Sequence, residues 1–107
     1  MKMKELTSID DLKELYNQPV VVIFKHSTRC PISAAAAREV AALEEDLPKG
    51  IILTRVLVIE QRDVSLKIAD DLLVKHESPQ VIVLKDGKVV YSASHYEIKK
   101  EAIKAHL

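Results

Sequence analysis

The sequence contains little cysteine and glycine and has no excess of charge of either sign. A single cysteine among 107 residues cannot form a disulfide within the chain, so the fold must be stable without such staples. Only two residues are glycine and 48% are apolar, which is enough hydrophobic material for a core. A formal net charge of zero gives no electrostatic sign of a nucleic-acid surface or of a disordered acidic tail.

Long hydrophobic runs are absent as well. The longest aliphatic or aromatic run is Val20–Phe24, which is far too short to span a bilayer. The first eleven residues are interrupted by charges and contain no apolar segment of the kind found in signal peptides. We therefore expect no membrane association and a cytoplasmic location, where a lone cysteine rests as a thiol.

What the sequence does contain is a regular alternation of helical and strand patterns. In the segment from Pro31 to Leu47, apolar residues recur every three or four positions, which is typical of a helix that packs on one face. Val20–Phe24 is continuously apolar, as expected for a strand buried on both faces. The patterns predict helices near residues 8–16, 31–47, 65–74 and 98–107, and strands near 20–24, 51–59, 81–84 and 88–92.

Local signals define how these elements begin and connect. Ser8 is the expected cap of the first helix, Asp63 or Ser65 that of the third, and Ser94 with Glu97 forms a possible capping box. Asp86-Gly87 predicts a tight hairpin. Strand–helix–strand units imply parallel pairing, and the hairpin adds an antiparallel edge. We predict one α/β domain over residues 1–107, with a four-stranded mixed sheet and helices on both faces.

Cys30 lies between the first buried strand and the long helix. Because Pro31 suits the first helical position, Cys30 is the expected N-cap. Helix amides and the helix dipole would favour its thiolate and lower its pKa, and Lys25, His26 and Arg29 lie nearby in sequence. A lone cysteine is often only a small buried hydrophobe, but the C-terminal edge of such a sheet is where α/β folds place their sites. We therefore favour a reactive Cys30.

Ser33 stands three residues after Cys30, where a dithiol redox site would carry its second cysteine. Serine cannot form a disulfide, so such a site attacks a disulfide but needs a second thiol from elsewhere. An ordinary serine in the first helical turn is an equally good interpretation.

Three segments of the chain resemble the monothiol bacilliredoxins, a thioredoxin-like family of Gram-positive bacteria. The resemblance covers essentially the whole chain, and its most specific part surrounds Cys30. The matching segments are Phe24–Ser33 with its Cys-Pro-Ile-Ser run, Arg62–Ser65 followed by His76–Gln80, and Ser94–Ile98.

The resemblance implies a thioredoxin-like fold and removal of bacillithiol, a low-molecular-weight thiol, from mixed disulfides on oxidised proteins. Cys30 would be the attacking thiol, bacillithiol a co-substrate rather than a bound cofactor, and S-bacillithiolated proteins the partners. Pro79 would be the cis-proline beside the cysteine, exposing the Ser78 backbone to an extended substrate. From the residues alone, Pro79 could equally open a strand.

The chain departs from its relatives at two positions. Arg29 stands where bacilliredoxins usually have threonine, which adds positive charge next to Cys30. Phe24 stands where thioredoxins keep a buried acid, so a proton shuttle through that acid is excluded.

The four histidines are weaker candidates. His26 either holds a proton near the thiol or ends a strand at the surface, and we favour the surface position. His76 fits a solvated position at a helix end, and His95 and His106 fit surface or packing positions. Their spacing does not suggest a metal site.

The main alternative to an enzyme is a thioredoxin-like protein-binding module with an inert cysteine. A Cys-His hydrolase or phosphatase fits poorly, because an alanine run follows Cys30 in place of a phosphate-binding loop. The oligomeric state stays open.

Overall fold

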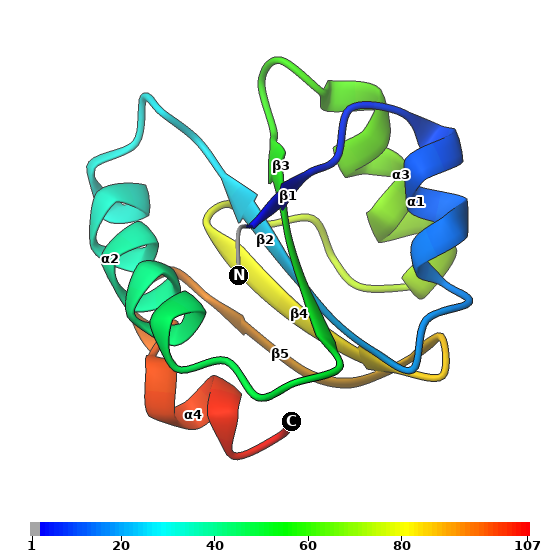
Figure 1. Ribbon diagram of the computed structural model, residues 1–107. Helices are drawn as coiled ribbons and strands as arrows, with labels where there is room; N and C mark the ends of the chain where they lie inside the picture. Colours follow the sequence, from blue (N-terminus) through cyan, green and yellow to red (C-terminus); the bar gives the residue numbers. More distant parts are fainter. Residues whose placement is uncertain (1–2) are drawn as a thin grey trace.

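The computed structural model describes residues 3–107, which form one sheet with helices on both faces (Figure 1). The sheet has five strands in the order β1-β3-β2-β4-β5. The strands are β1 (Lys4–Glu5), β2 (Val20–His26), β3 (Ile51–Leu57), β4 (Gln80–Lys85) and β5 (Lys88–Ser94). The helices are α1 (Ile9–Leu15), α2 (Pro31–Glu45), α3 (Arg62–Leu72), the 3-10 turn η1 (His95–Glu97) and α4 (Lys100–Lys104).

The fifth strand, β1, corrects the prediction of four. It pairs in parallel with β3, with Lys4 opposite Thr54 and Glu5 opposite Arg55. Both of its residues are charged and exposed, so they show none of the apolar alternation that identifies a strand in sequence. Backbone pairing and an ion pair between Glu5 and Arg55, 2.8 Å between Oε2 and Nε, hold the strand in place.

The pairing directions bring several strand ends to one edge of the sheet. β2 and β3 are parallel, β4 is antiparallel to β2, and β5 is antiparallel to β4. The C-terminal ends of β2, β3 and β5 therefore lie at the same edge as the start of β4. The loop that leads to Cys30 leaves from this edge, and Pro79 immediately precedes β4 there.

Two hydrophobic cores lie on opposite sides of the sheet, and Figure 1 shows α2 and α4 on one side and α1 and α3 on the other. Both cores use alternate residues of β2 and β4, which explains why these strands are apolar throughout. The first core contains mainly Val22, Phe24, Ala36, Val40, Leu43, Leu53, Val81, Val83, Ile98 and Ile103. The second contains Leu6, Leu12, Leu15, Val21, Ile23, Val56, Val64, Ile68, Ile82 and Leu84.

The expected cap of the third helix is wrong. The third helix begins at Arg62 with Gln61 at its N-cap, three residues earlier than predicted, and neither Asp63 nor Ser65 caps it. The turn after β3 closes early, because the Gln61 amide donates to the Leu57 carbonyl oxygen at 2.7 Å. Ser65 consequently lies inside the helix and is buried.

The expected C-terminal helix is divided into η1 and α4. Ser94 does not cap it, because its hydroxyl donates instead to Glu77 Oε1 at 3.0 Å. His95 takes a left-handed conformation (φ 55°), which turns the chain out of β5. The helix proper starts at Lys100, whose amide donates to Glu39 Oε1 of α2 at 2.8 Å. Glu39, which is 61 positions away, therefore accepts a helix amide in place of the local capping box that was expected at Ser94 and Glu97.

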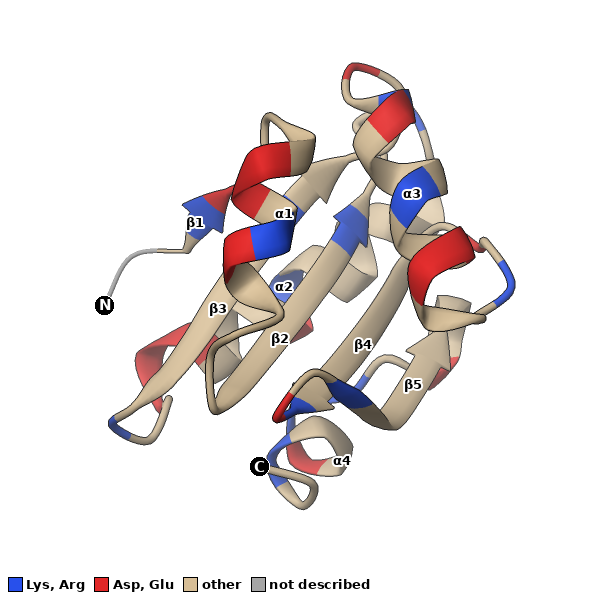
Figure 2. Ribbon diagram, turned by 90° about the vertical axis from the view of Figure 1, so that its right-hand side faces the viewer, with Lys and Arg blue, Asp and Glu red and all other residues tan. Residues whose placement is uncertain are grey.

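Charged residues lie mainly outside the sheet. Figure 2 shows Lys and Arg interspersed with Asp and Glu on the outer sides of α1 and α3, whereas the central strands carry little charge. Ion pairs such as Lys67–Asp71 on α3 link neighbouring charges of opposite sign.

We expect Leu43→Ala to lower the free energy of unfolding by about 2–5 kcal/mol, because it leaves a cavity between α2 and the sheet. Leu43 is fully buried in the first core. Leu66→Ala is the matched control, since Leu66 of α3 is 42% exposed and should change stability by less than about 0.5 kcal/mol. Urea unfolding of both variants measures the difference, and equal losses would contradict this account of the core.

Candidate active site

Cys30 is the N-cap of α2, as predicted, and its thiol is half-buried. Its extended backbone (φ −106°, ψ 121°) turns the chain from the β2 loop into the helix, and Pro31 occupies the first turn. The Ser33 amide donates to the Cys30 carbonyl oxygen at 3.0 Å, while the Cys30 side chain makes no capping hydrogen bond. The sulfur is thus held at the start of the helix and remains free to react.

The first turn of α2 lowers the pKa of the Cys30 thiol. The main causes are the backbone amides of Ser33 and Ile32, which attract a negative sulfur, and the Ser33 hydroxyl adds to them. These amides do not cap the neutral thiol, so their effect is on the thiolate. Partial burial raises the pKa of the thiol, but this effect is weaker than that of either amide. A larger thiolate fraction at neutral pH suits Cys30 to attack a disulfide.

Ser33 also holds the loop before Cys30 against the helix. Its side chain is fully buried, and its Oγ accepts a hydrogen bond from the Ser27 amide at 3.4 Å. The Ser27 hydroxyl accepts in turn from the Arg29 amide at 3.3 Å. Ser33 therefore does more than fill a helical turn, whereas Arg29 lies exposed beside Cys30.

The loop before β4 forms the neighbouring part of the site. The Ser78–Pro79 peptide bond is cis, as the resemblance implied, and Pro79 is buried. The Pro79 carbonyl oxygen accepts a hydrogen bond from the His95 amide at 3.0 Å, which joins this loop to the end of β5. Cys30, Pro79 and His95 thus belong to segments that meet at one edge of the sheet.

His26 ends β2 and is half-buried rather than a fully solvated surface residue. Its ring packs on Phe24, with centroids 5.2 Å apart. Burial and the charge of Arg55 lower the pKa of His26, so the ring is neutral at neutral pH. The neutral ring does not supply a permanent positive charge for the thiolate.

The sequence analysis counted Lys25 among the charged groups near Cys30 and missed that it is buried, on the side of β2 that faces the second core. Lys25 is completely buried, and its Nζ lies 3.1 Å from Nδ1 of His76. Ser65 Oγ lies 3.4 Å from Nδ1 of His76. Burial lowers the pKa of Lys25 to about 8, and burial together with the Lys25 charge lowers the pKa of His76. His76 is therefore a hydrogen-bond partner of Lys25 and not only a solvated histidine.

The alternation of side-chain direction along β2 was the one sequence feature that could have predicted the burial of Lys25. Val21 and Ile23 face the second core, and Lys25 continues the same side of the strand. Its partner, fifty-one positions away, has no local signature in the sequence.

Unpartnered polar atoms gather at this edge. Among residues 3–107, the buried side-chain atoms without a hydrogen-bond partner are His26 Nδ1, Ser78 Oγ and Gln80 Oε1. They come from the end of β2 and the start of β4, and Gln80 pairs across the sheet with Lys25. Buried polar groups are usually satisfied, so three such atoms close together set this edge apart from the rest of the described chain.

The other two histidines occupy the positions expected of them. His106 stacks on Tyr91 with ring centroids 4.0 Å apart, and exposed His95 lies 3.9 Å from Glu77. Within the described part of the chain, no three metal-ligating side chains cluster together. No helix there has both the length and the apolar character needed to cross a bilayer.

We expect Ser33→Ala to raise the pKa of Cys30 slightly while leaving it below that of a free thiol, because the two amides that contribute most remain. The variant also leaves the Ser27 amide without its acceptor, which should cost about 1 kcal/mol of stability. The pH dependence of iodoacetamide alkylation and urea unfolding measure the two effects. An unchanged pKa would show that the hydroxyl does not act on the sulfur.

We expect Lys25→Met to stabilise the protein at pH 7 by as much as about 3 kcal/mol, because it removes a buried charge whose pKa is lowered from 10.5 to about 8. Between pH 8 and 10.5 the folded state holds fewer protons at Lys25 than the unfolded state. The free energy of unfolding of the wild type should therefore rise with pH relative to that of the variant, so the difference between the two proteins should narrow. Urea unfolding across this range measures it, with exposed Lys88→Met as control. A gap that does not depend on pH would contradict the buried charge.

Solved structures share this fold over nearly the whole chain. A structure described as a candidate oxidoreductase with a thioredoxin fold is 31% identical, with a TM-score of 0.87, and the match covers 97% of this chain and 92% of the other. Thioredoxin from Fasciola hepatica is 22% identical with a TM-score of 0.77, covering 98% and 100%. Mitochondrial thioredoxin 3 from Saccharomyces cerevisiae is 19% identical with a TM-score of 0.75, covering 96% and 91%. The last two show the fold alone.

The family described as monothiol bacilliredoxin BrxC matches residues 2–103. This match, the thioredoxin fold and the exposed edge with a single acidified thiol agree on a thiol redox function. The chain belongs to the monothiol bacilliredoxin family.

Proposed function

We propose that the protein removes bacillithiol from mixed disulfides on oxidised proteins, with Cys30 as the only catalytic thiol. The observation that carries the proposal is the site's first helical turn. There Cys30 is accessible and has a lowered pKa, while buried Ser33 occupies the place of a resolving cysteine. The family match supports a redox role for this turn.

The reaction is two successive thiol–disulfide exchanges. The Cys30 thiolate attacks the bacillithiol sulfur, the S–S bond between that sulfur and the substrate cysteine breaks, and the substrate cysteine leaves as a thiolate that takes up a proton. Cys30 now carries bacillithiol in a mixed disulfide. A second thiolate, which must come from outside this chain, attacks the same bacillithiol sulfur and releases Cys30. Two electrons pass to the substrate, and the second thiol supplies them.

The residues around Cys30 stabilise its thiolate and bind the substrate protein. The amides of Ile32 and Ser33 stabilise the leaving and attacking forms of Cys30. The Ser78 backbone, next to the cis bond to Pro79, pairs with the oxidised protein as an extended chain. Arg29 directly precedes Cys30 and adds positive charge that favours acidic partners.

We further propose that residues 1–107 act as one domain, because a single sheet joins elements from Lys4 to Lys104. A reducing cytoplasm suits this chemistry, since it keeps a lone thiol reduced and supplies the second thiol.

We expect Cys30→Ser to abolish removal of bacillithiol from a bacillithiolated protein, whereas Ser33→Ala retains much of it, because only the thiol breaks the disulfide. Intact mass spectrometry follows loss of the adduct from the substrate, and an unchanged urea midpoint for Cys30→Ser shows that the variant is folded. Normal turnover by Cys30→Ser would overturn the proposal. A wild-type alkylation pKa at or above that of a free thiol would instead favour an inert binding module.

A further inference from the structure

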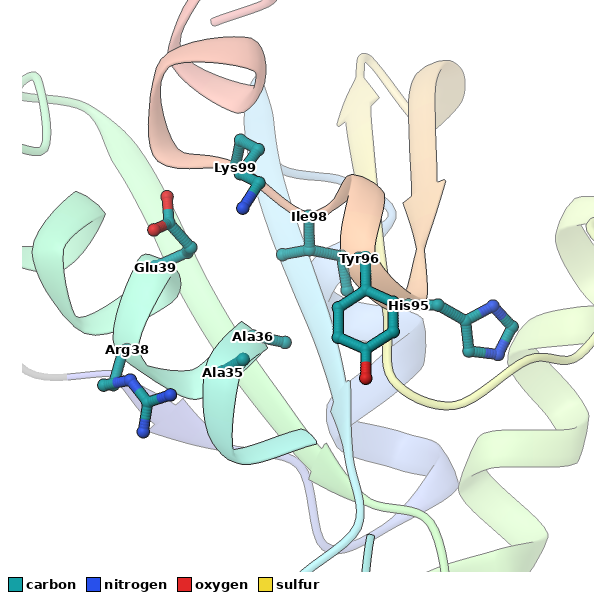
Figure 3. A pocket seen from close by; sticks show the side chains of 8 residues that line it. All are labelled: Ala35, Ala36, Arg38, Glu39, His95, Tyr96, Ile98 and Lys99. Carbon is teal, nitrogen blue, oxygen red and sulfur yellow. The ribbon is translucent and has the colours of Figure 1, made fainter. Parts of the chain in front are cut away.

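A pocket of about 220 Å³ lies between α2 and the segment that follows β5. Its lining residues come from the second and third turns of α2 on one side and from η1 and the two residues that connect it to α4 on the other (Figure 3). This volume suits part of a small molecule rather than a whole drug-sized ligand. The residues are Ala35, Ala36, Arg38, Glu39, His95, Tyr96, Ile98 and Lys99.

The pocket begins in the second turn of α2, the helix whose N-cap is Cys30. Both of its walls are continuations of the segments that frame the site. One wall is α2, which starts immediately after Cys30, so that Ala35 and Glu39 follow it by about 8 and 14 Å along the helix. The other wall begins at His95, whose amide is bonded to the Pro79 carbonyl oxygen. A small molecule attached to Cys30 could therefore extend into the pocket along the protein surface.

The floor of the pocket is apolar and its rim is cationic. Ala35, Ala36 and Ile98 form small apolar surfaces, and the short alanine side chains leave space that longer ones would fill. In Figure 3 the Lys99 amine points toward the gap between α2 and η1. Arg38 and Lys99 are both exposed, and neither forms an ion pair with any residue from 3 to 107.

The remaining charged groups of the pocket are already engaged. Glu39 accepts the Lys100 amide at 2.8 Å, which anchors α4. His95 turns its ring toward Glu77, 3.9 Å away, and Figure 3 shows that ring directed away from the other labelled side chains. The pocket is therefore lined by two uncommitted cations, Arg38 and Lys99, and by one carboxylate, Glu39, that has a structural partner. The pocket favours a ligand with an acidic end and a compact body.

We propose that this pocket binds the carboxylate-bearing end of the low-molecular-weight thiol while its sulfur exchanges at Cys30, with Arg38 and Lys99 selecting an acidic thiol. The inference rests on the proposed function and assigns its small-molecule subsite. The exchange itself is unchanged: the Cys30 thiolate bonds to the sulfur of the small thiol, and the other half of the disulfide leaves as a thiolate.

The test measures how fast reduced protein reacts with two disulfides. Oxidised bacillithiol carries carboxylates, whereas its methyl ester has the same length with those groups neutral. We expect Arg38→Gln and Lys99→Gln each to slow the reaction with oxidised bacillithiol by about 2- to 5-fold, the range of one exposed ion pair, and to leave the ester reaction unchanged. Quenched samples analysed by intact mass spectrometry give the rate constants.

Lys88→Gln is the matched control, because Lys88 is an exposed cation beside the hairpin at the opposite end of β5. It should alter neither rate. Equal effects of the Arg38 and Lys99 variants on both disulfides, or no effect on either, would overturn the pocket while leaving the exchange at Cys30 intact. A wild-type protein that reacts with bis(2-hydroxyethyl) disulfide but not with oxidised bacillithiol would overturn the proposed function itself.

Discussion

The attraction between the first amides of α2 and a negative sulfur at Cys30 is the interaction on which the site depends. It exists only while the first turn of the helix is held in one place. Below the turn, Ala36, Val40 and Leu43 anchor α2 on the sheet, and the buried Ser33 hydroxyl ties the turn to the preceding loop. A loosely packed helix would present its amides to water instead, so the chemistry of one atom relies on the whole first core.

The sheet topology supplies the rest of the site around that turn. Because β2 and β3 are parallel and β4 and β5 alternate in direction, the Cys30 loop, the Pro79 loop and the end of β5 share an edge. The hydrogen bond from His95 to Pro79 joins two of them. The thiol, the Ser78–Pro79 segment and the pocket thus lie near one another, which is the arrangement that the proposed exchange between a protein and a small thiol requires.

The buried Lys25 lowers the stability of the protein at this edge of the sheet. A lysine completely buried beside a neutral histidine is poorly compensated, because His76 offers it a hydrogen bond but no negative charge. Stability alone would favour an apolar residue at that position. Together with the unpartnered Ser78 and Gln80 atoms, it leaves this edge with poorly satisfied polar groups, and functional sites commonly depart from optimal packing in this way.

Much of this protein was determined by its sequence alone. The helical spacing after Pro31, the apolar run at Val20–Phe24 and the Asp86-Gly87 turn defined the α/β class, and Pro31 placed Cys30 at a helix start. These features are local: each depends on residues within a few positions of one another, so periodicity and turn chemistry are enough to find them.

The tertiary structure decided what depends on distant partners. It added β1, whose charged residues are a strand only because β3 lies beside them, and it replaced the expected Ser94 cap by Glu39. It also buried Lys25 against His76 and opened the pocket between α2 and η1. Segments far apart in the chain become neighbours only when the two cores form, because burial of apolar surface sets that packing and local sequence does not encode it.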